Sequence, residues 1–224
     1  MSLYLVSTPI GNLGDMSFRA VDVLKAVDLI ASEDTRKTSI LLRHYGISKP
    51  QIAFHTVNEQ KLTPKLVGRM LGGDTIALVT NAGTPGISDP GYSLLHSAVE
   101  AGLPVTAIPG PTAAVMAITL SALPMHSFTF RGFAPHKEGP RKRFLMVDQE
   151  SPHTLVFYES PYRLKAFLKT AFEVFGDRRA MVANDLTKKF ETLYRGRLPE
   201  LINKFETEIV RGEYCLVIEG KRED

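Results

Sequence analysis

Apolar runs of strand length alternate with amphipathic segments along the first half of the chain. The runs are bounded by polar, glycine or proline residues, and the segments between them carry apolar residues at helical spacing. The predicted strands are residues 3–7, 29–32, 52–54, 75–80 and 105–108. The predicted helices are residues 18–27, 37–45, 64–71, 90–101 and 112–122. Strands that alternate with helices in this way favour βαβ units and a parallel sheet.

The second half has a different pattern, which begins after an interruption at residues 121–127. Its predicted strands are joined partly by helices and partly by short turns, which indicates a mixed sheet. These strands are residues 128–133, 154–158, 180–184, 192–194 and 214–219. One helix is well marked, with Ser160 as its N-cap, Pro161 as its first residue and Gly176 as its terminator. We therefore expect two α/β domains, residues 1–122 with a mostly parallel sheet and residues 123–224 with a mixed sheet.

Polar residues follow each predicted strand of the first half at the point where it ends. Because the carboxyl ends of parallel strands meet at one edge of a sheet, we expect these segments to form one ligand site. They are residues 8–12, 33–36, 55–59, 80–92 and 109–112. The longest, TNAGTPGISDPGY at residues 80–92, contains three glycines and two prolines, so its backbone can approach a small molecule closely. In this segment Asp89 is expected to cap the next helix and Pro90 to begin it.

Taken singly, these polar residues also have ordinary structural explanations. Thr35 could be an N-cap, His55 could be a hydrogen-bonded loop residue, and Asn58-Glu59 could begin the next helix. Five coincidences of this kind are less expected than one site, so the convergence favours a ligand site.

Composition and charge narrow the class of protein. With 224 residues, 44% of them hydrophobic, the chain can bury a core, and no apolar run approaches the roughly 20 residues of a membrane span. We expect a cytoplasmic protein. The single cysteine, Cys215, lies in the apolar run YCLVI and is expected to be buried. The net charge of +3 arises in the second half. Residues 131–143 hold five basic side chains against Glu138, and this segment is either a phosphate-contacting loop or a solvated surface.

Several common catalytic motifs are missing from the sequence. No Gly-x-Gly-x-x-Gly follows the first strand, so neither a dinucleotide fold nor the usual S-adenosylmethionine fold of similar architecture is supported. There is no P-loop lysine, no His or Cys pair with metal-ligand spacing, and no Gly-x-Ser-x-Gly elbow. The crevice that remains suits a small, largely uncharged or zwitterionic cofactor held by backbone groups, with no metal.

Six strings, in order along essentially the whole chain, resemble one protein family. They are STPIGNLGD (7–15), ASEDTR (31–36), TNAGTPGISDPG (80–91), IPGPTA (108–113), FYESPYR (157–163) and DLTKKFE (185–191). The family is that of bacterial enzymes that methylate a cytidine 2′-oxygen in 16S ribosomal RNA, within the tetrapyrrole-methylase-like class of S-adenosylmethionine enzymes. The choice of RNA over tetrapyrrole rests chiefly on EDTR, AGTPGISDPG and FYESPYR.

The resemblance implies a cofactor cleft between the two domains and a homodimer. Carried over residue by residue, the S-adenosylmethionine site consists of Pro9, Asn81, Ala82, Gly83, Thr84, Ile87, Thr112, Ala113, Phe157, Tyr158, Ala183 and Asn184. All of these positions lie at the ends of predicted strands.

The activity that the resemblance implies is an in-line displacement, in which a ribose 2′-oxygen attacks the methyl carbon and a base removes the hydroxyl proton. The candidate bases are Asp34, His55 and Glu59, with Glu159 and Lys188 in the second domain, and each could equally make a structural hydrogen bond or ion pair. The expected partner is 16S rRNA or the 30S subunit. Arg36 and Lys188 are expected to hold phosphates near the target, and further RNA contacts are expected from Arg131, Lys137, Arg141, Lys142 and Arg143.

The sequence departs from the family pattern at three places. Asn81 stands where aspartate is usual, and Asn184-Asp185 where Arg-Glu is common. The chain ends at Asp224, whereas many relatives continue into a small helical domain, so the basic stretch is the best remaining RNA contact. Two rival functions stay open: methylation of a porphyrin or corrin precursor, and a non-catalytic S-adenosylmethionine-binding factor on the ribosome.

Overall fold

The computed structural model describes residues 1–222 and divides into two compact units, Met1–Thr112 and Ala113–Asp224. Each unit has its own sheet and its own buried core. No helix among residues 1–222 is both long enough and apolar enough to cross a membrane. The two-domain α/β organisation predicted from the hydrophobic pattern is confirmed.

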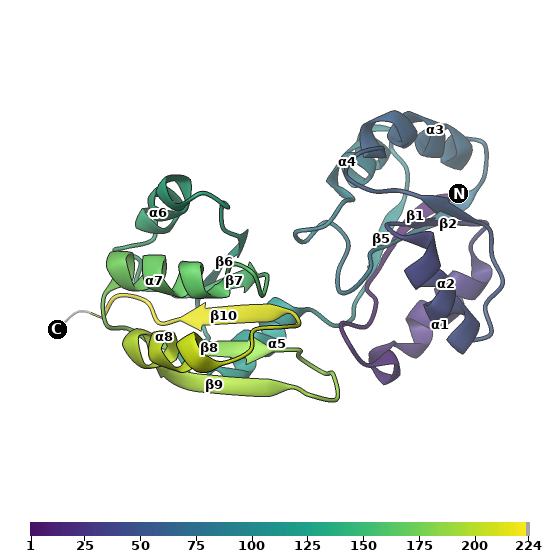
Figure 1. Ribbon diagram of the computed structural model, residues 1–224. Helices are drawn as coiled ribbons and strands as arrows, with labels where there is room; N and C mark the ends of the chain where they lie inside the picture. Colours follow the sequence, from purple (N-terminus) through teal and green to yellow (C-terminus); the bar gives the residue numbers. More distant parts are fainter. Residues whose placement is uncertain (223–224) are drawn as a thin grey trace. The chain divides into compact units, whose positions relative to one another are not determined.

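The first unit is built on a five-stranded parallel sheet with strand order β3-β2-β4-β1-β5. Figure 1 labels β1, β2 and β5 of this sheet. Its strands are β1 (Ser2–Val6), β2 (Leu29–Ser32), β3 (Gln51–Ala53), β4 (Thr75–Val79) and β5 (Val105–Ile108). Each end lies within one residue of the predicted end. Strands β2 and β4 are almost wholly buried, so their sequences are continuous apolar runs and do not alternate apolar with polar residues.

Helices cover both faces of this sheet. They are α1 (Phe18–Ala26), α2 (Thr35–His44), α3 (Glu59–Leu71) and α4 (Tyr92–Glu100). Leu24 of α1 and Leu41 of α2 belong to one buried cluster, whereas Leu66 of α3 and Leu94 of α4 belong to a second cluster on the opposite face. The unit is therefore doubly wound, and the loops at the carboxyl ends of its strands are left for ligand binding.

Three helices of the first unit begin elsewhere than predicted. α2 begins at Thr35, two residues before its predicted start. α3 begins at Glu59, so Pro64 lies inside the helix and Thr63 is buried, with its hydroxyl 3.2 Å from Ser93 Oγ. α4 begins at Tyr92 after Gly91, so the predicted cap at Asp89 and first residue at Pro90 are wrong. Gly91 has a φ of 144°, and a Cβ there would lie 2.9 Å from Leu78 Cδ2. Only glycine adopts this backbone readily, and it separates Pro90 from the helix.

The second unit contains a mixed sheet with strand order β6-β7-β10-β8-β9. Only β6 and β7 pair in parallel, and the other described pairs are antiparallel. The strands are β6 (Phe128–Phe133), β7 (Thr154–Glu159), β8 (Arg179–Asn184), β9 (Thr192–Arg197) and β10 (Tyr214–Ile218). The prediction of a mixed sheet is confirmed.

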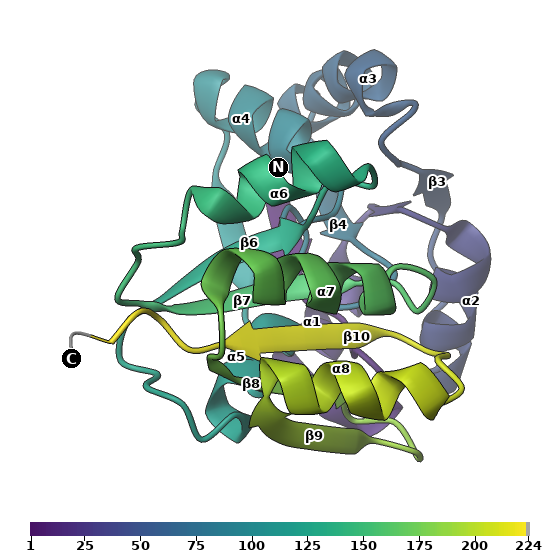
Figure 2. The ribbon, with the colours of Figure 1, turned by 60° about the vertical axis from the view of Figure 1, so that its left-hand side comes forward.

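Four helices pack on this second sheet. They are α5 (Ala113–Leu120), α6 (Glu138–Met146), α7 (Leu164–Phe175) and α8 (Leu198–Thr207). Residues of α6, α7 and α8 share one buried cluster, and Figure 2 shows α7 and α8 in front of the sheet with α5 behind it. α5 packs against β7 and β10, so residues 113–122 lie with the second unit although the sequence places them at the end of the first.

α7 also begins later than predicted. Residues 161–163 form a turn in which Arg163 N and Leu164 N both bond to Ser160 O, and the helix itself starts at Leu164. Its predicted end is correct, because Gly176 follows α7 with a φ of 70°.

Candidate functional site

The loops that follow β1 and β4 are joined at the carboxyl edge of the first sheet. Thr8 N donates to Gly83 O at 2.9 Å, and Gly83 N donates to Thr8 O at 3.0 Å. The hydroxyls of Ser7 and Thr84 lie 3.0 Å apart, and Thr8 Oγ1 donates to Thr80 O at 3.2 Å. These contacts bring the segment that begins at Pro9 alongside the turn at residues 81–84.

The loop after β5 approaches the same place. A Cβ on Gly110 would lie 2.8 Å from Ser7 Cβ, so only glycine permits this contact. A Cβ on Gly83, which has a φ of 84°, would lie 3.8 Å from Pro111 O. The loops that carry Pro9, Gly83 and Thr112 therefore meet at one surface, as predicted from their positions at strand ends.

Two polar atoms in this surface are buried without a hydrogen-bond partner among residues 1–222. They are Thr80 Oγ1 and Asn81 Oδ1. The backbone N–H of Asn81 is occupied, because it donates to Glu33 Oε2 at 2.9 Å. A buried polar atom without a partner is costly, so a bound polar ligand would stabilise this loop. Ile87, farther along the loop, is exposed.

Asp34 and Arg36 form an ion pair at the start of α2. Asp34 Oδ1 accepts from Arg36 N at 2.9 Å and from Arg36 Nε at 3.0 Å, and Arg36 Nη2 lies 2.8 Å from Asp34 Oδ2. The hydrogen bonds from Arg36 lower the pKa of Asp34 to about 2. Asp34 is thus the N-cap that was suggested for Thr35, and it is a weak base.

His55 and Glu59 lie around the start of α3. Asn58 Oδ1 accepts from His55 N at 2.8 Å, and Asn58 Nδ2 donates to Ala53 O at 3.0 Å, which fixes the turn between β3 and α3. Glu59 Oε2 accepts from Ser93 Oγ at 3.1 Å and so links α3 to α4. Both candidate bases are half-buried. Asn58-Glu59 does begin a helix, as its structural explanation suggested.

Asp89 was expected only to cap a helix, but it is the one carboxyl group of the loop at residues 80–92, and its pKa is strongly raised. Its side chain is half-buried between Ser88, which has a φ of 64°, and the buried Pro90. Burial is the main cause that raises the pKa of Asp89 to about 6, and the charge of Glu33 adds to it. Asp89 can therefore take up or release a proton near neutral pH.

The second unit brings its own candidate cofactor residues together. Tyr158 of β7 pairs with Cys215 of β10, which in turn pairs with Ala183 of β8, so the carboxyl ends of β7 and β8 lie side by side across β10. Tyr158 Oη accepts from Ala114 N at 3.1 Å, which places the start of α5, with Ala113, beside Tyr158.

The side chains at these strand ends differ in what they can offer a ligand. The ring of Phe157 is buried in the core, with its centroid 5.1 Å from that of Phe167, so only its backbone can face a ligand. The side-chain amide nitrogen of Asn184, Nδ2, donates to Arg211 O at 3.1 Å. That bond does not use the side-chain carbonyl oxygen, which is the group that Asn184 can offer a ligand.

Glu159 ends β7 and is buried. It forms an ion pair with Arg163, and its Oε1 accepts from Ser160 N at 2.8 Å. Its Oε2 is buried without a hydrogen-bond partner among the described residues. Burial raises the pKa of Glu159, and Ser160 and Arg163 act in the opposite direction. This arrangement is typical of a structural carboxylate that orients Arg163, whose Nη1 also donates to Ala134 O at 3.0 Å.

Lys188 lies in a strained turn after β8. Asp185 and Thr187 have φ values of 50° and 65°, and Thr187 Oγ1 is buried without a hydrogen-bond partner within residues 1–222. Lys188 Nζ lies 2.8 Å from Asp185 Oδ1 and 2.7 Å from Glu213 Oε2. Burial disfavours its charge, but these two contacts prevail and raise the pKa of Lys188. Lys188 therefore stays protonated and is a poor base.

The basic stretch at residues 131–143 is not uniform. Arg141 is buried, and its Nε donates to Thr170 Oγ1 at 3.0 Å and its Nη1 to His136 O at 3.1 Å. Because its guanidinium is held inside the unit, we no longer expect Arg141 to contact RNA. Arg131 is partly buried, lies 3.0 Å from Asp148 Oδ2 and covers the Phe144 ring. Lys137, Lys142 and Arg143 are exposed.

Sequence comparison identifies the family. The sequence model of the Tetrapyrrole (Corrin/Porphyrin) Methylases matches residues 2–202. The chain belongs to this family. The protein is therefore a methyltransferase, and the resemblance noted from the six strings is confirmed.

Relatives within the tetrapyrrole methylase family match nearly the whole chain. The "Ribosomal RNA small subunit methyltransferase I" of Halalkalibacterium halodurans is 44% identical over 222 residues, which cover 99% of this chain and 77% of the relative. The protein of the same name from Synechocystis sp. is 46% identical over 219 residues, which cover 97% of this chain and 78% of the relative.

Solved structures of other methyltransferases share the fold at low sequence identity. The methyltransferase CobJ has a TM-score of 0.74 at 14% identity, and the match covers 100% of this chain and 97% of that one. A uroporphyrin-III C-methyltransferase from Thermus thermophilus, solved with S-adenyl homocysteine, has a TM-score of 0.68 at 17% identity, with 97% of each chain covered. These likenesses support the tetrapyrrole methylase fold.

The geometry of this methylase separates two groups within the predicted site. Within the first unit, strand ends meet at the glycine-rich turn, and within the second unit, β7 and β8 end at the same edge of their sheet. Asp34, Glu159 and Lys188 are instead held in ion pairs. Asp89 was given only a structural role from the sequence, and its raised pKa makes it a further candidate. The signal available for it was an acidic residue inside the glycine- and proline-rich loop itself.

Proposed function

We propose that this methyltransferase transfers a methyl group from S-adenosylmethionine to the ribose 2′-oxygen of a cytidine in 16S rRNA. The observation that carries the proposal is identity above 40% over almost the full chain with proteins named small-subunit rRNA methyltransferases. These alignments cover 97–100% of the chain, so both units are matched almost in full. A cytoplasmic location and a homodimer belong to the same proposal.

The cofactor is assigned to the strand-end residues carried over from the family motifs. In the first unit, the unpartnered Asn81 Oδ1 and the glycine backbone at Gly83 suit a zwitterionic ligand with few fixed charges. Pro9, Ala82, Thr84, Ile87 and Thr112 complete that set. In the second unit, the set is Ala113, Phe157, Tyr158, Ala183 and Asn184. When bound, S-adenosylmethionine supplies an already activated methyl group.

The remaining demand on the protein is to orient the hydroxyl and accept its proton. As the 2′-oxygen forms its bond to the methyl carbon, the carbon–sulfur bond breaks and the hydroxyl proton leaves. We assign the proton to Asp89, because it lies half-buried in the same loop, residues 80–92, that carries the first-unit cofactor residues. Its pKa of about 6 also lies nearer to neutral pH than that of Asp34, at about 2. His55 and Glu59 are the alternative acceptors at the same sheet edge.

The substrate strand needs cations that remain accessible. Arg36 is 89% exposed at its side chain beyond the Asp34 pair, and Lys137, Lys142 and Arg143 lie exposed on or beside α6. These residues are assigned to phosphate groups, which position RNA without reading its sequence. Lys142 is also paired, with Glu173, but its side chain is about half exposed. Arg131 and Lys188 are more buried in their ion pairs and are assigned to the margin of this set.

Methylation of a tetrapyrrole is the second candidate, because the family description and the solved neighbours point to it. Methyl-labelled S-adenosylmethionine is incubated with the protein and, separately, 30S subunits, protein-free 16S rRNA and uroporphyrinogen. Label in either RNA lane supports the proposal, and the two lanes distinguish the assembled subunit from free rRNA. Label in the tetrapyrrole lane contradicts it. Cofactor binding without any label indicates a non-catalytic ribosome-associated factor.

A further inference from the structure

A basic groove lies at one end of the second unit, between the end of β10 and the starts of β8 and α8. Its volume is about 460 Å³. The groove is lined by five cationic side chains, from Arg178, Arg179, Arg197, Lys221 and Arg222, and by three carboxylates, from Glu150, Asp177 and Glu219. Charge within the groove is therefore unbalanced, with two more cations than carboxylates.

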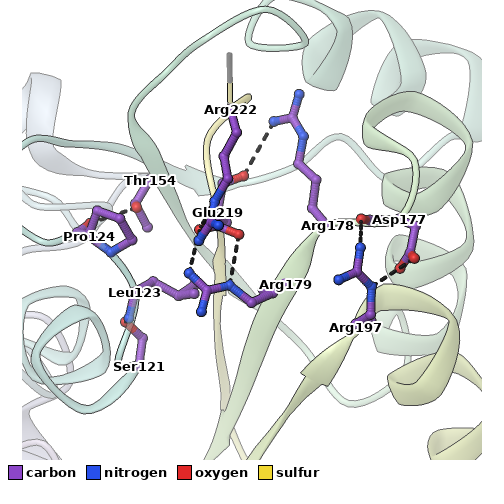
Figure 3. A network of polar contacts seen from close by, with 10 residues as sticks. All are labelled: Ser121, Leu123, Pro124, Thr154, Asp177, Arg178, Arg179, Arg197, Glu219 and Arg222. Carbon is purple, nitrogen blue, oxygen red and sulfur yellow. Dashed lines mark hydrogen bonds and ion pairs between the residues drawn. The ribbon is translucent and has the colours of Figure 1, made fainter. Parts of the chain in front are cut away.

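The carboxylates are shared among four of these cations. Glu219 accepts from Arg179, with Nε to Oε2 at 3.0 Å and Nη2 to Oε1 at 2.6 Å, and also from Arg222 Nε at 2.8 Å (Figure 3). Asp177 Oδ2 lies 2.7 Å from Arg197 Nε, and Glu150 pairs with Lys221. The side chains of Arg197, Lys221 and Arg222 are at least half exposed, so each has N–H groups left for a ligand.

Arg178 is the cation without a carboxylate. It forms no ion pair with any residue from 1 to 222, and its guanidinium donates only to backbone carbonyls, to Glu219 O at 3.3 Å and to Gln149 O. Its Cζ lies 4.9 Å from the centroid of the Phe175 ring. Burial lowers the pKa of Arg178, although Glu150 and Glu219 act in the opposite direction. A half-buried guanidinium without a counter-ion is stabilised by an incoming anion.

The strand register places two arginines of the groove opposite each other, which is unfavourable in addition to the unpaired charge of Arg178. Arg179 of β8 pairs directly with Arg197 of β9. Like charges directly opposite on neighbouring strands are destabilising, and here each arginine is compensated by a separate carboxylate. Four arginines and a lysine gathered around one groove are better matched to a polyanion than to a single small anion.

We propose that this groove binds the phosphodiester backbone of the RNA substrate, through Arg178, Arg222 and Lys221. The site is separate from the candidate cofactor residues of the same unit. Arg179 begins β8 and Asn184 ends it, and at about 3.3 Å per residue these ends are roughly 17 Å apart. The groove thus contacts RNA at a distance from the reacting ribose. This inference rests on the proposed function, because it takes the polyanion to be the substrate.

Phosphate suits the groove better than the carboxylates of an acidic peptide. A guanidinium donates two parallel N–H groups to two oxygens of one phosphate, and a phosphodiester chain presents its charges at regular intervals without needing apolar pockets. The unpaired Arg178 and the excess of two positive charges in the groove match contacts with about two phosphates. For a single strand, each such contact changes the slope of log K against log salt by about 0.7.

The test compares wild type with Arg178→Gln and with the double variant K221Q/R222Q, using 30S subunits or 16S rRNA, whichever the wild type methylates. Lys169→Gln, an exposed cation of α7 paired with Glu206, is the matched control. Both groove variants are expected to raise KM for RNA by about threefold or more. The salt dependence of RNA binding should weaken by roughly one phosphate contact for each cation that is removed. The kcat and the affinity for S-adenosylhomocysteine should not change. The double variant keeps the test valid if Arg178→Gln does not fold, because Lys221 and Arg222 are exposed.

Unchanged KM and unchanged salt slope in the double variant, with wild-type RNA methylation intact, would overturn the groove proposal and leave the proposed function standing. Loss of binding to poly-glutamate without any change for RNA would also overturn it, in favour of an acidic protein partner. If the wild type methylates no RNA at all, the proposed function fails, and the groove proposal fails with it.

Discussion

Replacing Asp89 by asparagine should make the protein more stable and less active. The substitution keeps the size of the side chain and removes the charge that burial and Glu33 disfavour. If Asp89 also accepts the proton in the reaction, methyl transfer should fall by about 10²–10⁴-fold in the same variant. A residue that lowers stability but is needed for activity is typical of a functional site.

The size of the stability effect follows from the pKa. A rise from 3.8 to about 6 is roughly two units at about 1.4 kcal/mol each, which gives about 3 kcal/mol as an upper bound. Because Asp89 is only partly buried, water screens the interaction, and we expect about 1–2 kcal/mol. A raised carboxyl pKa favours the folded state at low pH. Its contribution is complete below pH 3.8 and is lost as the pH rises through about 6.

Thermal and urea unfolding of wild type and Asp89→Asn at pH 4 and pH 7.5 measures this effect. The variant should gain about 1–2 kcal/mol at pH 7.5, or about 2–8 °C in Tm, and close to nothing at pH 4. Asp22→Asn, at an exposed position of α1, is the control and should change stability by no more than about 0.5 kcal/mol. An equal gain in stability at both pH values, or no gain at pH 7.5, would refute the claim that the charged form of Asp89 destabilises the folded protein.

Three further substitutions test the packing around the candidate site. Gly91→Ala should lower the free energy of unfolding by about 2–4 kcal/mol in urea titrations, because Gly91 has a φ of 144° and a Cβ there would collide with Leu78. The control Gly68→Ala in α3, where a Cβ meets open space, should be stabilising. Arg163→Met should cost about 3–5 kcal/mol in thermal unfolding by leaving Glu159 buried without its cation, and adding Glu159→Gln should restore most of it; no recovery would argue against the ion pair as the cause. Ser7→Ala removes the contact with Thr84 and should weaken S-adenosylhomocysteine binding in calorimetry by roughly 1 kcal/mol, and unchanged affinity would place the cofactor elsewhere.

Most of the fold follows from the hydrophobic pattern because its strands are short, buried and separated by strong turn residues. The strands of the first sheet are predicted within one residue, since each apolar run ends where the chain leaves the core. Helix starts are harder to predict. At α4 the decisive feature is the φ of Gly91, and a preceding Asp-Pro gives no sign of it.

Helix α6 shows why charge patterns mislead. Its sequence, EGPRKRFLM, reads as a basic loop, yet it forms a helix that buries Arg141 against Thr170. The distinction between a buried and an exposed arginine depends on tertiary contacts with α7, which lie 29 residues away in the sequence. The same limit applies to Asp89, whose pKa is raised mainly by its burial in the folded chain and further by the nearby charge of Glu33.

The positions of the cofactor loops were more predictable, because parallel strands deliver their ends to one edge of a sheet whatever the side chains are. The bridge between Thr8 and Gly83 is the direct result. The individual roles of Asp34 and Lys188 were not predictable, since their ion pairs with Arg36, Asp185 and Glu213 form only in the folded chain.

The position of the transferred methyl group on the RNA tests the central proposal most directly. RNA labelled by the wild type from methyl-labelled S-adenosylmethionine is hydrolysed in alkali and its products are separated. Because a 2′-O-methyl group blocks attack on the adjacent phosphodiester, the account predicts that the label is recovered in an alkali-resistant dinucleotide with cytidine on the 5′ side. Label recovered in mononucleotides would show methylation of a base and would contradict the account.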